Sequence, residues 1–231
     1  MVREIFRDRK DAGRNLGIQL RPLRRMDPII IGVSRGGVPV AYEVARELDA
    51  PLDVCLVRRV IDPSTPEIGI GAVAEGGGFY VGEKIRGELE MSDEDVVAAV
   101  ARAWRELEAR VQRIRERVPL LNVRRRNLIV VDDGMVTGAS ARAALDALRR
   151  RRPAGVVLAL PVAASPAAKE LARVADDIVC LHSEEPFIAV ACWYRNYSTA
   201  TDEQVIELLE RARGYRAVGS SVPPSRAVLR H

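Results

Sequence analysis

The segment between residues 128 and 140 reads LIVVDDGMVTGAS. Its short apolar run leads into two adjacent carboxylates, Asp132 and Asp133, and its loop ends in Thr-Gly-Ala-Ser ahead of an alanine-rich helical pattern. A glycine-bearing loop at a helix N-terminus presents unpaired N–H groups and the positive end of the helix dipole, which favour a phosphate. Acids at the carboxyl end of a strand can accept hydrogen bonds from a sugar diol. The segment therefore predicts a sugar-phosphate site, although Asp-Asp-Gly followed by a capping Ser140 is also an ordinary turn.

Similar Val- and Ile-rich runs recur along the chain and alternate with helical patterns. Continuous apolar runs suit strands that are buried on both faces of a sheet. The runs occupy residues 28–33, 53–59, 127–133, 155–162 and 177–182, and the helical patterns occupy residues 38–48, 139–150 and 167–175. This alternation predicts an α/β fold with a mainly parallel, twisted sheet flanked by helices.

One segment interrupts the alternation. From Ser92 to Val118, apolar residues recur at steps of three and four with charges between them, and Ser92 is a suitable N-cap. The resulting amphipathic helix fits either a coiled-coil seam between subunits or packing on the chain's own body. We interpret residues 84–122 as a helical insertion within a single domain that spans residues 1–213.

The C-terminal part contains one further helix signal. Thr201 and Gln204 form a capping-box pattern that opens a helix through Arg213. Residues 214–231 contain two prolines and no apolar periodicity, so we predict a mobile tail there.

Two apolar residues, two acids and a loop ending in Thr-Gly-x-Ser resemble the phosphoribosyl diphosphate (PRPP) signature of the type I phosphoribosyltransferases. The resemblance implies a three-layer, Rossmann-like fold in which residues 183–213 form a C-terminal hood. It also implies that Asp132 and Asp133 hold the ribose hydroxyls. The loop that would hold the 5-phosphate comprises Gly134, Val136, Thr137, Gly138, Ala139 and Ser140.

A second match lies upstream, where GVSRGG at residues 32–37 follows the first predicted strand. It resembles the diphosphate loop of the same family, which implies that Ser34, Arg35, Gly36 and Gly37 contact the diphosphate. The glycines allow close approach of the backbone, and Arg35 offers a charged fork. The family loop often contains a non-proline cis peptide, which we expect near Ser34 and Arg35. The alternative is a glycine turn that packs a helix on the sheet.

A third feature is the pair Arg58 and Arg59 at the end of the second predicted strand. The resemblance implies that a basic residue here meets the diphosphate. The segment that follows, IDPSTPEIGIGAVAEGGG at residues 61–78, is compatible with a mobile lid and equally with an exposed β-hairpin.

The chain also departs from the family pattern. In the 6-oxopurine branch, a carboxylate within the loop acts as a base toward the purine, whereas this chain has Val136 at that position. That departure argues against a 6-oxopurine acceptor handled in the same way. Phe187 and Trp193, with Tyr194, are candidates to stack on the acceptor, or else to pack the C-terminal helix on the core.

These features together predict a phosphoribosyltransferase, which is a glycosyltransferase of the pentosyl class. It would transfer ribose 5-phosphate from Mg-PRPP to a nitrogenous acceptor, most simply a nucleobase, with Asp132, Asp133, Arg35 and Arg59 as catalytic residues. We expect Mg²⁺ as cofactor, held by the substrate, with Asp132 as the candidate protein ligand. One alternative is a PRPP-sensing regulator that uses arginines 124–126 and 149–152. Another is a hydrolase or phosphorylase of ribose phosphates.

The composition limits the other classes of function. Of the 231 residues, 48% are hydrophobic and 29% are charged, and the net charge of +4 is too small to indicate a polyanion by itself. The N-terminus lacks the apolar core of a signal peptide, and the longest apolar run is too short for a bilayer. The three isolated cysteines resemble buried hydrophobes. We expect a cytoplasmic homodimer with small-molecule substrates and neither membrane nor nucleic-acid partners.

Overall fold

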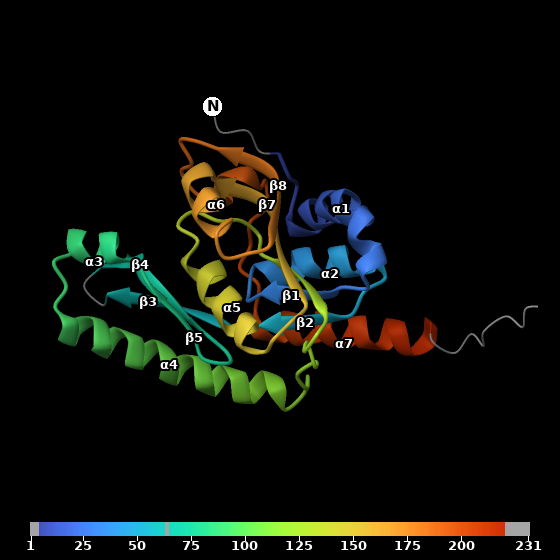
Figure 1. Ribbon diagram of the computed structural model, residues 1–231, viewed down its shortest axis with the longest axis horizontal. Coiled ribbons are helices and arrows are strands. Elements are labelled where there is room, and N and C mark those ends of the chain that lie inside the picture. The colour runs from blue at the N-terminus through green and yellow to red at the C-terminus, as the bar shows by residue number, and fades with distance from the viewer. Residues whose placement is uncertain (1–4, 63–64, 220–231) are drawn as a thin grey trace, which may run out of the picture.

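The computed structural model describes residues 5–62 and 65–219, and a parallel sheet lies at its centre (Figure 1). Within these residues the sheet has five strands in the order β2-β1-β6-β7-β8, and every neighbouring pair is parallel. The strands are β1 Ile29–Val33, β2 Leu52–Cys55, β6 Asn127–Val131, β7 Gly155–Ala164 and β8 Asp177–Glu184. The predicted fold class is confirmed.

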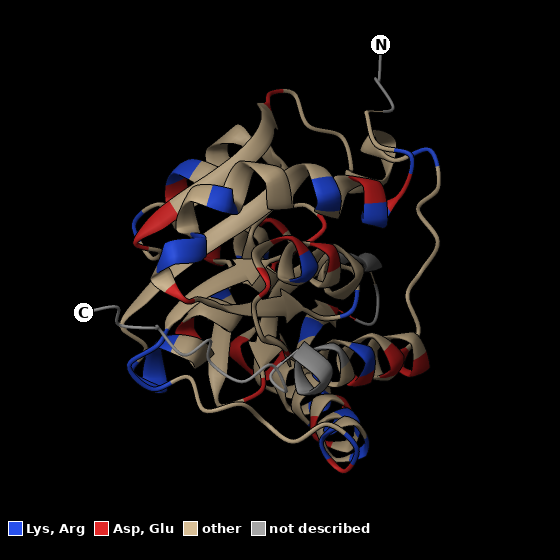
Figure 2. Ribbon diagram, turned by 90° about the vertical axis from the view of Figure 1, so that its right-hand side faces the viewer, with Lys and Arg blue, Asp and Glu red and all other residues tan. Residues whose placement is uncertain are grey.

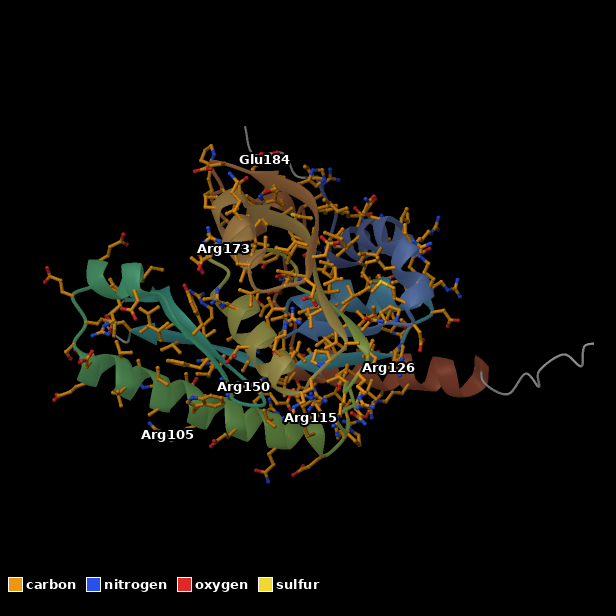
Figure 3. All side chains as sticks on the ribbon, viewed as in Figure 1. Arg105, Arg115, Arg126, Arg150, Arg173 and Glu184 are labelled. Atoms are coloured by element: carbon orange, nitrogen blue, oxygen red, sulfur yellow. The ribbon has the colours of Figure 1, made fainter. Side chains whose placement is uncertain are left out.

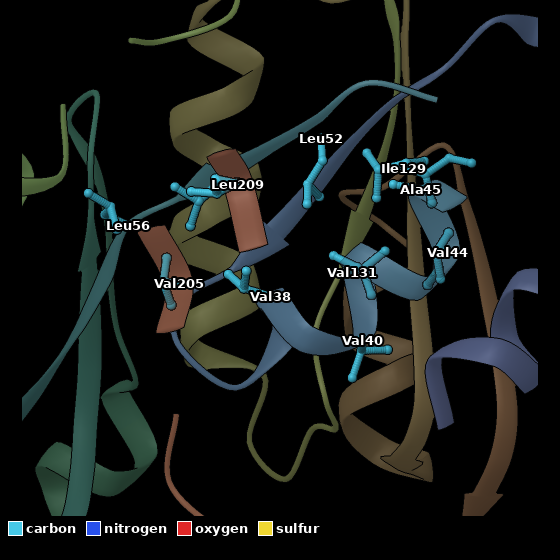
Figure 4. Close-up of a cluster of buried hydrophobic side chains, with 14 of the residues drawn as sticks. Val38, Val40, Val44, Ala45, Leu52, Leu56, Ile129, Val131, Val205 and Leu209 are labelled. Carbon is cyan, nitrogen blue, oxygen red and sulfur yellow. The ribbon is translucent and has the colours of Figure 1, made fainter. Parts of the chain in front are cut away.

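Helices cover both faces of this sheet because side chains alternate across each strand. Ile30 and Ile129 pack with one set of helices, whereas their neighbours Ile29 and Leu128 pack with the other. The first set is α1 Arg9–Leu20, α2 Gly37–Leu48 and α7 Asp202–Gly219, and the second is α5 Ala139–Arg150 and α6 Ser165–Leu171. Figure 4 shows the first layer, in which side chains from α2 and α7 meet those of the strands.

Helix α1 was not predicted from the sequence. Asp8 caps its N-terminus by accepting a hydrogen bond from the amide of Asp11, and Leu16 and Leu20 are fully buried against α2 and the sheet. A Cβ on Gly13 would lie only 2.6 Å from the carbonyl oxygen of Val40, so α1 and α2 approach closely where glycine leaves room. This contact brings Arg9, the first residue of α1, to the edge of the sheet.

The described part of residues 61–78, for which the sequence allowed either a lid or a hairpin, belongs to a set of antiparallel strands. Strands β3 Val57–Asp62, β4 Thr65–Ala74 and β5 Gly78–Val81 pair in sequence order to make a second, smaller sheet. It extends away from the central sheet, with the short helix α3 Glu83–Glu88 at its far end (Figure 1). The described part of residues 61–78 thus pairs as a hairpin, but Ile70, Ala72, Val73 and Ala74 are buried, so the expectation of an exposed hairpin is wrong for them.

Helix α4, Asp93–Arg115, lies along this smaller sheet (Figure 1). Ser92 caps it through a capping box with Asp95, as the sequence predicted for Ser92. The buried stripe includes Leu107 and Ile114, whereas Val97 at the N-terminal end is 67% exposed. The amphipathic insertion thus packs on the chain's own body.

A buried ion-pair network anchors the C-terminal end of α4. Arg115 donates to Oδ1 of Asp53 at 2.7 Å and makes two bonds of 2.7 Å with the carboxylate of Glu75. Asp53 is fully buried and also accepts from the amide of Leu121. Figure 3 shows Arg115 where α4 adjoins the body of the protein, and Arg105 on the outward side of the same helix. The network fixes the insertion relative to the central sheet.

The C-terminal helix begins as predicted and runs further than predicted. Thr201 and Gln204 form the capping box with bonds of 3.0 and 3.2 Å, and α7 continues to Gly219 rather than ending at Arg213. The predicted tail from residue 214 is therefore helical up to residue 219, and residues 220–231 lie outside the described part.

Basic and acidic residues are interspersed along the ribbon in Figure 2. Across residues 5–62 and 65–219, no helix combines the length and the hydropathy needed to span a lipid bilayer.

Candidate active site

The loops that follow β1 and β6 lie side by side because these two strands are neighbours in the sheet. Together with the smaller sheet and residues 189–200, they enclose a pocket of about 750 Å³ at the carboxyl ends of the strands. This is the position where open α/β sheets bind ligands. The predicted site residues that line it are Ser34, Arg35, Gly36, Arg59, Asp132, Asp133, Gly134, Val136, Thr137, Gly138, Ala139 and Ser140.

The predicted 5-phosphate loop connects β6 to the N-terminus of α5. Its backbone is held by Met135, whose amide donates to the carbonyl of Val162 at 3.1 Å and whose carbonyl accepts from the amide of Ala164 at 2.8 Å. Gly138 caps the helix in the left-handed region, with φ 79°, which glycine adopts without strain. The first N–H groups of α5 therefore face the pocket at the positive end of the helix dipole.

The two carboxylates differ in their surroundings. Asp133 is buried, and its Oδ2 accepts from Nε of Arg9 at 2.7 Å and from the hydroxyl of Tyr197 at 2.9 Å. The Arg9 guanidinium also lies 3.9 Å from the centre of the Tyr197 ring, and the hydroxyl of Tyr194 donates to the backbone carbonyl of Asp133. One oxygen of Asp133 is thus committed to Arg9 and Tyr197.

Asp132 has no ion pair among the described residues, and its Oδ1 accepts the amide of Asp133 at 2.9 Å. Burial raises the pKa of Asp132 well above its usual range, and the neighbouring charge of Asp133 adds to the shift. A carboxylate whose charged form is destabilised by burial becomes more stable when a hydroxyl donor or a cation approaches it. Asp132 is therefore the acid of the pair that is better placed to take up a new partner.

The predicted diphosphate loop contacts the acid pair directly. The peptide bond between Ser34 and Arg35 is cis, as the resemblance implied. A Cβ on Gly36 would lie 2.2 Å from Oδ2 of Asp133, and a Cβ on Gly37 would lie 2.5 Å from the carbonyl oxygen of Val131. Only glycine fits between the two loops at these positions. Gly37 itself packs beneath the pocket rather than lining it, whereas Arg35 is exposed at its wall.

The structure separates the two arginines of β3 because successive residues of a strand point to opposite faces. Arg59 lines the pocket and lies over β4, where a Cβ on Gly69 would be 2.7 Å from its Nε. Arg58 instead pairs with Glu106 of α4 at 2.5 Å and does not line the pocket. Of the two predicted diphosphate contacts, only Arg59 is therefore placed for that role.

The predicted acceptor-stacking residues do not line the pocket, and this expectation is corrected. Phe187 and Trp193 stack on each other with ring centres 5.6 Å apart, and Trp193 also stacks on His182 at 6.0 Å. With Phe6 they form a small apolar cluster between β8 and the N-terminal segment. Trp193 is buried and Phe187 is half-buried against the chain itself. The nearby pocket wall consists of Ala189, Val190, Tyr197, Thr199 and Ala200.

Sequence reasoning missed Arg9 and Tyr197. A signal for Arg9 existed: Asp8 is a good N-cap, and Ala12, Leu16 and Leu20 recur every four residues behind it. That pattern predicts a helix with an arginine in its first turn, but not the contact with Asp133. For Tyr197 the sequence offered only its place among other aromatic residues.

The potential metal ligands and the thiols of the described residues are limited in number and reactivity. Among the described residues, no group of three or more His, Cys, Asp and Glu side chains could hold a metal ion. Burial raises the pKa of the Cys55 thiol to about 12 and that of Cys180 to about 11, so both remain protonated at neutral pH. The cysteines thus behave as unreactive, largely apolar groups.

The fold and this site define a class of protein: an α/β domain in which two glycine-bearing loops and an acid pair share one pocket at the carboxyl ends of a parallel sheet. The comparisons with known proteins agree with this description. Residues 5–195 match the phosphoribosyl transferase domain family. The chain therefore belongs to that family, as its motifs predicted.

Two kinds of relative extend the comparison. The crystal structure of TT1426 from Thermus thermophilus is 39% identical, with a TM-score of 0.73, and the match covers 89% of this chain and 98% of that one. Proteins from two Mycobacterium tuberculosis strains, which are named provisionally as phosphoribosyl transferases, are 37% identical over 212 residues. That alignment covers 90% of this chain and 47% of the relatives, so the chain spans about half the length of the curated relatives it matches.

Proposed function

We propose that the protein binds Mg-PRPP and transfers its ribose 5-phosphate group to a nitrogenous acceptor with release of diphosphate. The observation that carries the proposal is the convergence of three features on one pocket: the N-terminus of α5, the acid pair after β6 and the loop with the cis peptide after β1. Each feature suits one part of PRPP, namely its 5-phosphate, its ribose and its diphosphate. A pentosyl transfer uses all three at once.

The 5-phosphate would lie against the loop that ends in Thr137, Gly138, Ala139 and Ser140. The amides of the first turn of α5 and the hydroxyls of Thr137 and Ser140 are donors at a place where the helix dipole already favours an anion. Gly138 allows the backbone to turn there without a side chain in the way.

The ribose would lie over the acid pair. Asp132 would accept its hydroxyls, since its carboxylate is the one without an ion pair among the described residues. Asp133, held by Arg9 and Tyr197, would fix the position of Asp132 and add negative charge beneath the ring. Two carboxylates stabilise the positive charge that develops on the ribose as the bond to diphosphate lengthens.

The diphosphate would lie between the loop after β1 and the smaller sheet. Arg35 and Arg59 line the pocket from opposite sides and would offset the charge that grows on the leaving group. The bond from the anomeric carbon to the diphosphate oxygen breaks, and its electron pair leaves with the diphosphate. The acceptor nitrogen supplies the pair that forms the new bond to that carbon and loses its proton to water or to the departing diphosphate.

The pocket residues are compatible with a magnesium ion that is held mainly by the substrate. Mg²⁺ is commonly held by one or two carboxylates together with substrate phosphates and water, and Asp132 is the pocket carboxylate without an ion pair among the described residues. When bound, the ion would neutralise part of the charge on the diphosphate.

The acceptor would enter beside Val136, Ala189 and Val190, which line the pocket with apolar side chains. Val136 is 43% exposed at the position where the 6-oxopurine branch has a carboxylate, so the loop offers no base of that kind. This wall suits a flat, uncharged nitrogen acceptor better than one that must give a proton to the protein.

The alternative function, a PRPP-sensing regulator, would use the arginines of residues 124–126 and 149–152 on a partner. Several of these already have partners within the chain: Arg126 pairs with Asp27, Arg149 with Asp176 and Arg150 with Asp146. Figure 3 shows Arg126 on the body of the protein, and Arg150 lies at the end of α5 beside the smaller sheet, where its partner Asp146 also accepts from the amide of Phe79 at 3.3 Å. Their contacts favour a role in holding the fold.

The test is diphosphate release from PRPP in the presence of Mg²⁺ across a panel of purines, pyrimidines and simple amines. Release that depends on one acceptor supports the proposal, with Asp132→Asn as the inactive control. Binding of PRPP without turnover for any acceptor would favour the regulator, and sugar-phosphate consumption without an acceptor would favour a hydrolase.

A further inference from the structure

The inserted helix α4 reaches the candidate site through one side chain, Arg110. Its Nη1 donates to the hydroxyl oxygen of Ser34 at 3.2 Å, and its Nε donates to Oδ1 of Asp202 at 2.7 Å. Ser34 lines the pocket and forms the cis peptide with Arg35. Arg110 therefore links the insertion, the first turn of α7 and the diphosphate loop.

The hydrogen bonds of Ser34 determine where its hydroxyl hydrogen points. Its Oγ accepts from the amide of Val57 at 3.0 Å and from Arg110 at 3.2 Å. A serine hydroxyl has two acceptor positions and one donor. Because both acceptor positions are filled by protein donors, the hydroxyl hydrogen points away from both donors and is available to an acceptor in the pocket that Ser34 lines.

The burial of Arg110 in this position is unfavourable for the stability of the fold. Its side chain is only 16% exposed, and its Nη2 is buried with no hydrogen-bond partner among the described residues. Burial lowers the pKa of the Arg110 guanidinium, and the nearby charge of Arg35 lowers it further, although Asp202 opposes both effects. A buried cation with an unsatisfied nitrogen beside a second cation is unfavourable for stability alone and is more often found where function requires it.

We infer that Arg110 is a positioning residue for recognition of the diphosphate group: it fixes Ser34 so that the serine hydroxyl donates to an anionic oxygen in the pocket. The inference rests on the proposed function, since it assumes that the diphosphate of PRPP binds at this loop. It assigns to the inserted helix a part in the site in addition to its packing on the smaller sheet.

The same helix provides a matched control. Arg113 lies one turn after Arg110 and also pairs with Asp202, but its side chain is 58% exposed, and the bond to Ser34 comes from Arg110. Arg113→Gln therefore removes a partner of Asp202 and a charge from α4 while leaving the Ser34 bond in place. Arg110→Gln also removes a partner of Asp202 and a charge from α4, and it removes the bond to Ser34 as well.

The experiment measures binding of inorganic diphosphate and of ribose 5-phosphate, each by calorimetry with Mg²⁺, to the full chain. Arg110→Gln should weaken diphosphate binding about three- to tenfold, the equivalent of one hydrogen bond. It should leave ribose 5-phosphate binding unchanged, because that probe uses the loop before α5. Arg113→Gln should bind both probes as the parent does. Arg110→Lys should not restore diphosphate binding, since an ammonium cannot keep the fork between Asp202 and Ser34.

A double-mutant cycle makes the assignment sharper. If Arg110 acts through Ser34, then Arg110→Gln should have no further effect on diphosphate binding once Ser34→Ala is present. An undiminished effect in that background, full rescue by Arg110→Lys, or parent-like diphosphate binding by Arg110→Gln would overturn the inference while the proposed function stands. A parent protein that binds neither probe would overturn both. If Arg110→Gln does not fold, the Arg110→Lys variant carries the same cycle.

Discussion

Gly36→Ala tests the contact between the two loops of the site. Gly36 has φ −61° and ψ −36°, an ordinary helical conformation that alanine adopts without strain. The added Cβ, however, would lie 2.2 Å from Oδ2 of Asp133, whereas ordinary contacts begin at 3.4 Å. The Asp133 carboxylate would therefore have to move by roughly 1 Å, since the backbone on both sides is packed.

The size of the effect follows from what holds that carboxylate. Its Oδ2 is bonded to Arg9 at 2.7 Å and to Tyr197 at 2.9 Å, and a shift of this size would break or strongly weaken both bonds. Hydrogen bonds to charged groups contribute about 1.5–3 kcal/mol each. We therefore expect Gly36→Ala to lower the free energy of unfolding by about 3–5 kcal/mol, and Tm by roughly 6–20 °C for a domain of this size.

Urea denaturation of four proteins measures the effect: the parent, Gly36→Ala, Asp133→Ala and the double variant. With the carboxylate gone, the added methyl group meets no obstacle from it, and Gly36→Ala should become neutral or stabilise by about 0.4–1 kcal/mol. Gly87→Ala is the control, because a Cβ there would have nothing within 4 Å. The reasoning fails if Gly36→Ala is as stable as the parent, or if its cost is the same with and without Asp133.

Three other variants probe separate parts of the account. Asp132→Asn should be more stable than the parent at pH 8. Burial raises the pKa of Asp132, so its ionisation destabilises the folded state as pH rises. The gain in stability should disappear by about pH 4, and urea titrations at both pH values would show this. Arg59→Gln should weaken diphosphate binding roughly tenfold, whereas Arg58→Gln should leave it unchanged. If calorimetry showed an equal loss of diphosphate affinity in both variants, the assignment of the two arginines to opposite faces of β3 would be contradicted. Asp53→Ala should cost about 3–5 kcal/mol, because Arg115 and the amide of Leu121 lose a buried carboxylate acceptor while Glu75 stays paired with Arg115. Glu207→Ala, from an exposed pair, should cost less than about 0.5 kcal/mol, and similar values for the two variants in thermal unfolding would refute the comparison.

The sequence was sufficient where the signal is local. The run that ends in Asp132 and Asp133, and the loop that ends in Ser140, follow from a strand, a turn and a helix that are consecutive in the chain. The same holds for the N-cap at Ser92 and for the capping box at Thr201; the cis peptide at Ser34 was instead implied by the family resemblance. Such features depend on neighbours within a few residues, which periodicity and residue type describe well.

The sequence was insufficient where partners are distant. Arg9 lies 124 positions and Tyr197 lies 64 positions from Asp133, so their contacts depend on how α1 and residues 189–200 close over the sheet. The family resemblance implied that Asp133 holds ribose hydroxyls, but the sequence did not show that the structure buries Asp133 with Arg9 and Tyr197 bonded to one of its oxygens. Its removal should therefore affect folding as well as binding.

Two other predictions depended on which way the side chains point rather than on residue type. Arg58 and Arg59 are equivalent in composition, and only the register of β3 against β4 decides which one faces the pocket. Phe187 and Trp193 had the right chemistry for stacking on an acceptor, but they stack on each other, and Trp193 also stacks on His182, in a cluster that includes Phe6. The predicted homodimer stays a prediction.

The most direct test of the central claim is a crystal structure of the protein grown with PRPP and Mg²⁺. The account predicts the 5-phosphate within hydrogen-bond distance of the amides of residues 137–140, the ribose hydroxyls on Asp132, and the diphosphate beside Ser34 and Arg35. A structure in which PRPP binds elsewhere, or in which the turn before α5 remains without a phosphate while the ligand is bound, would contradict it.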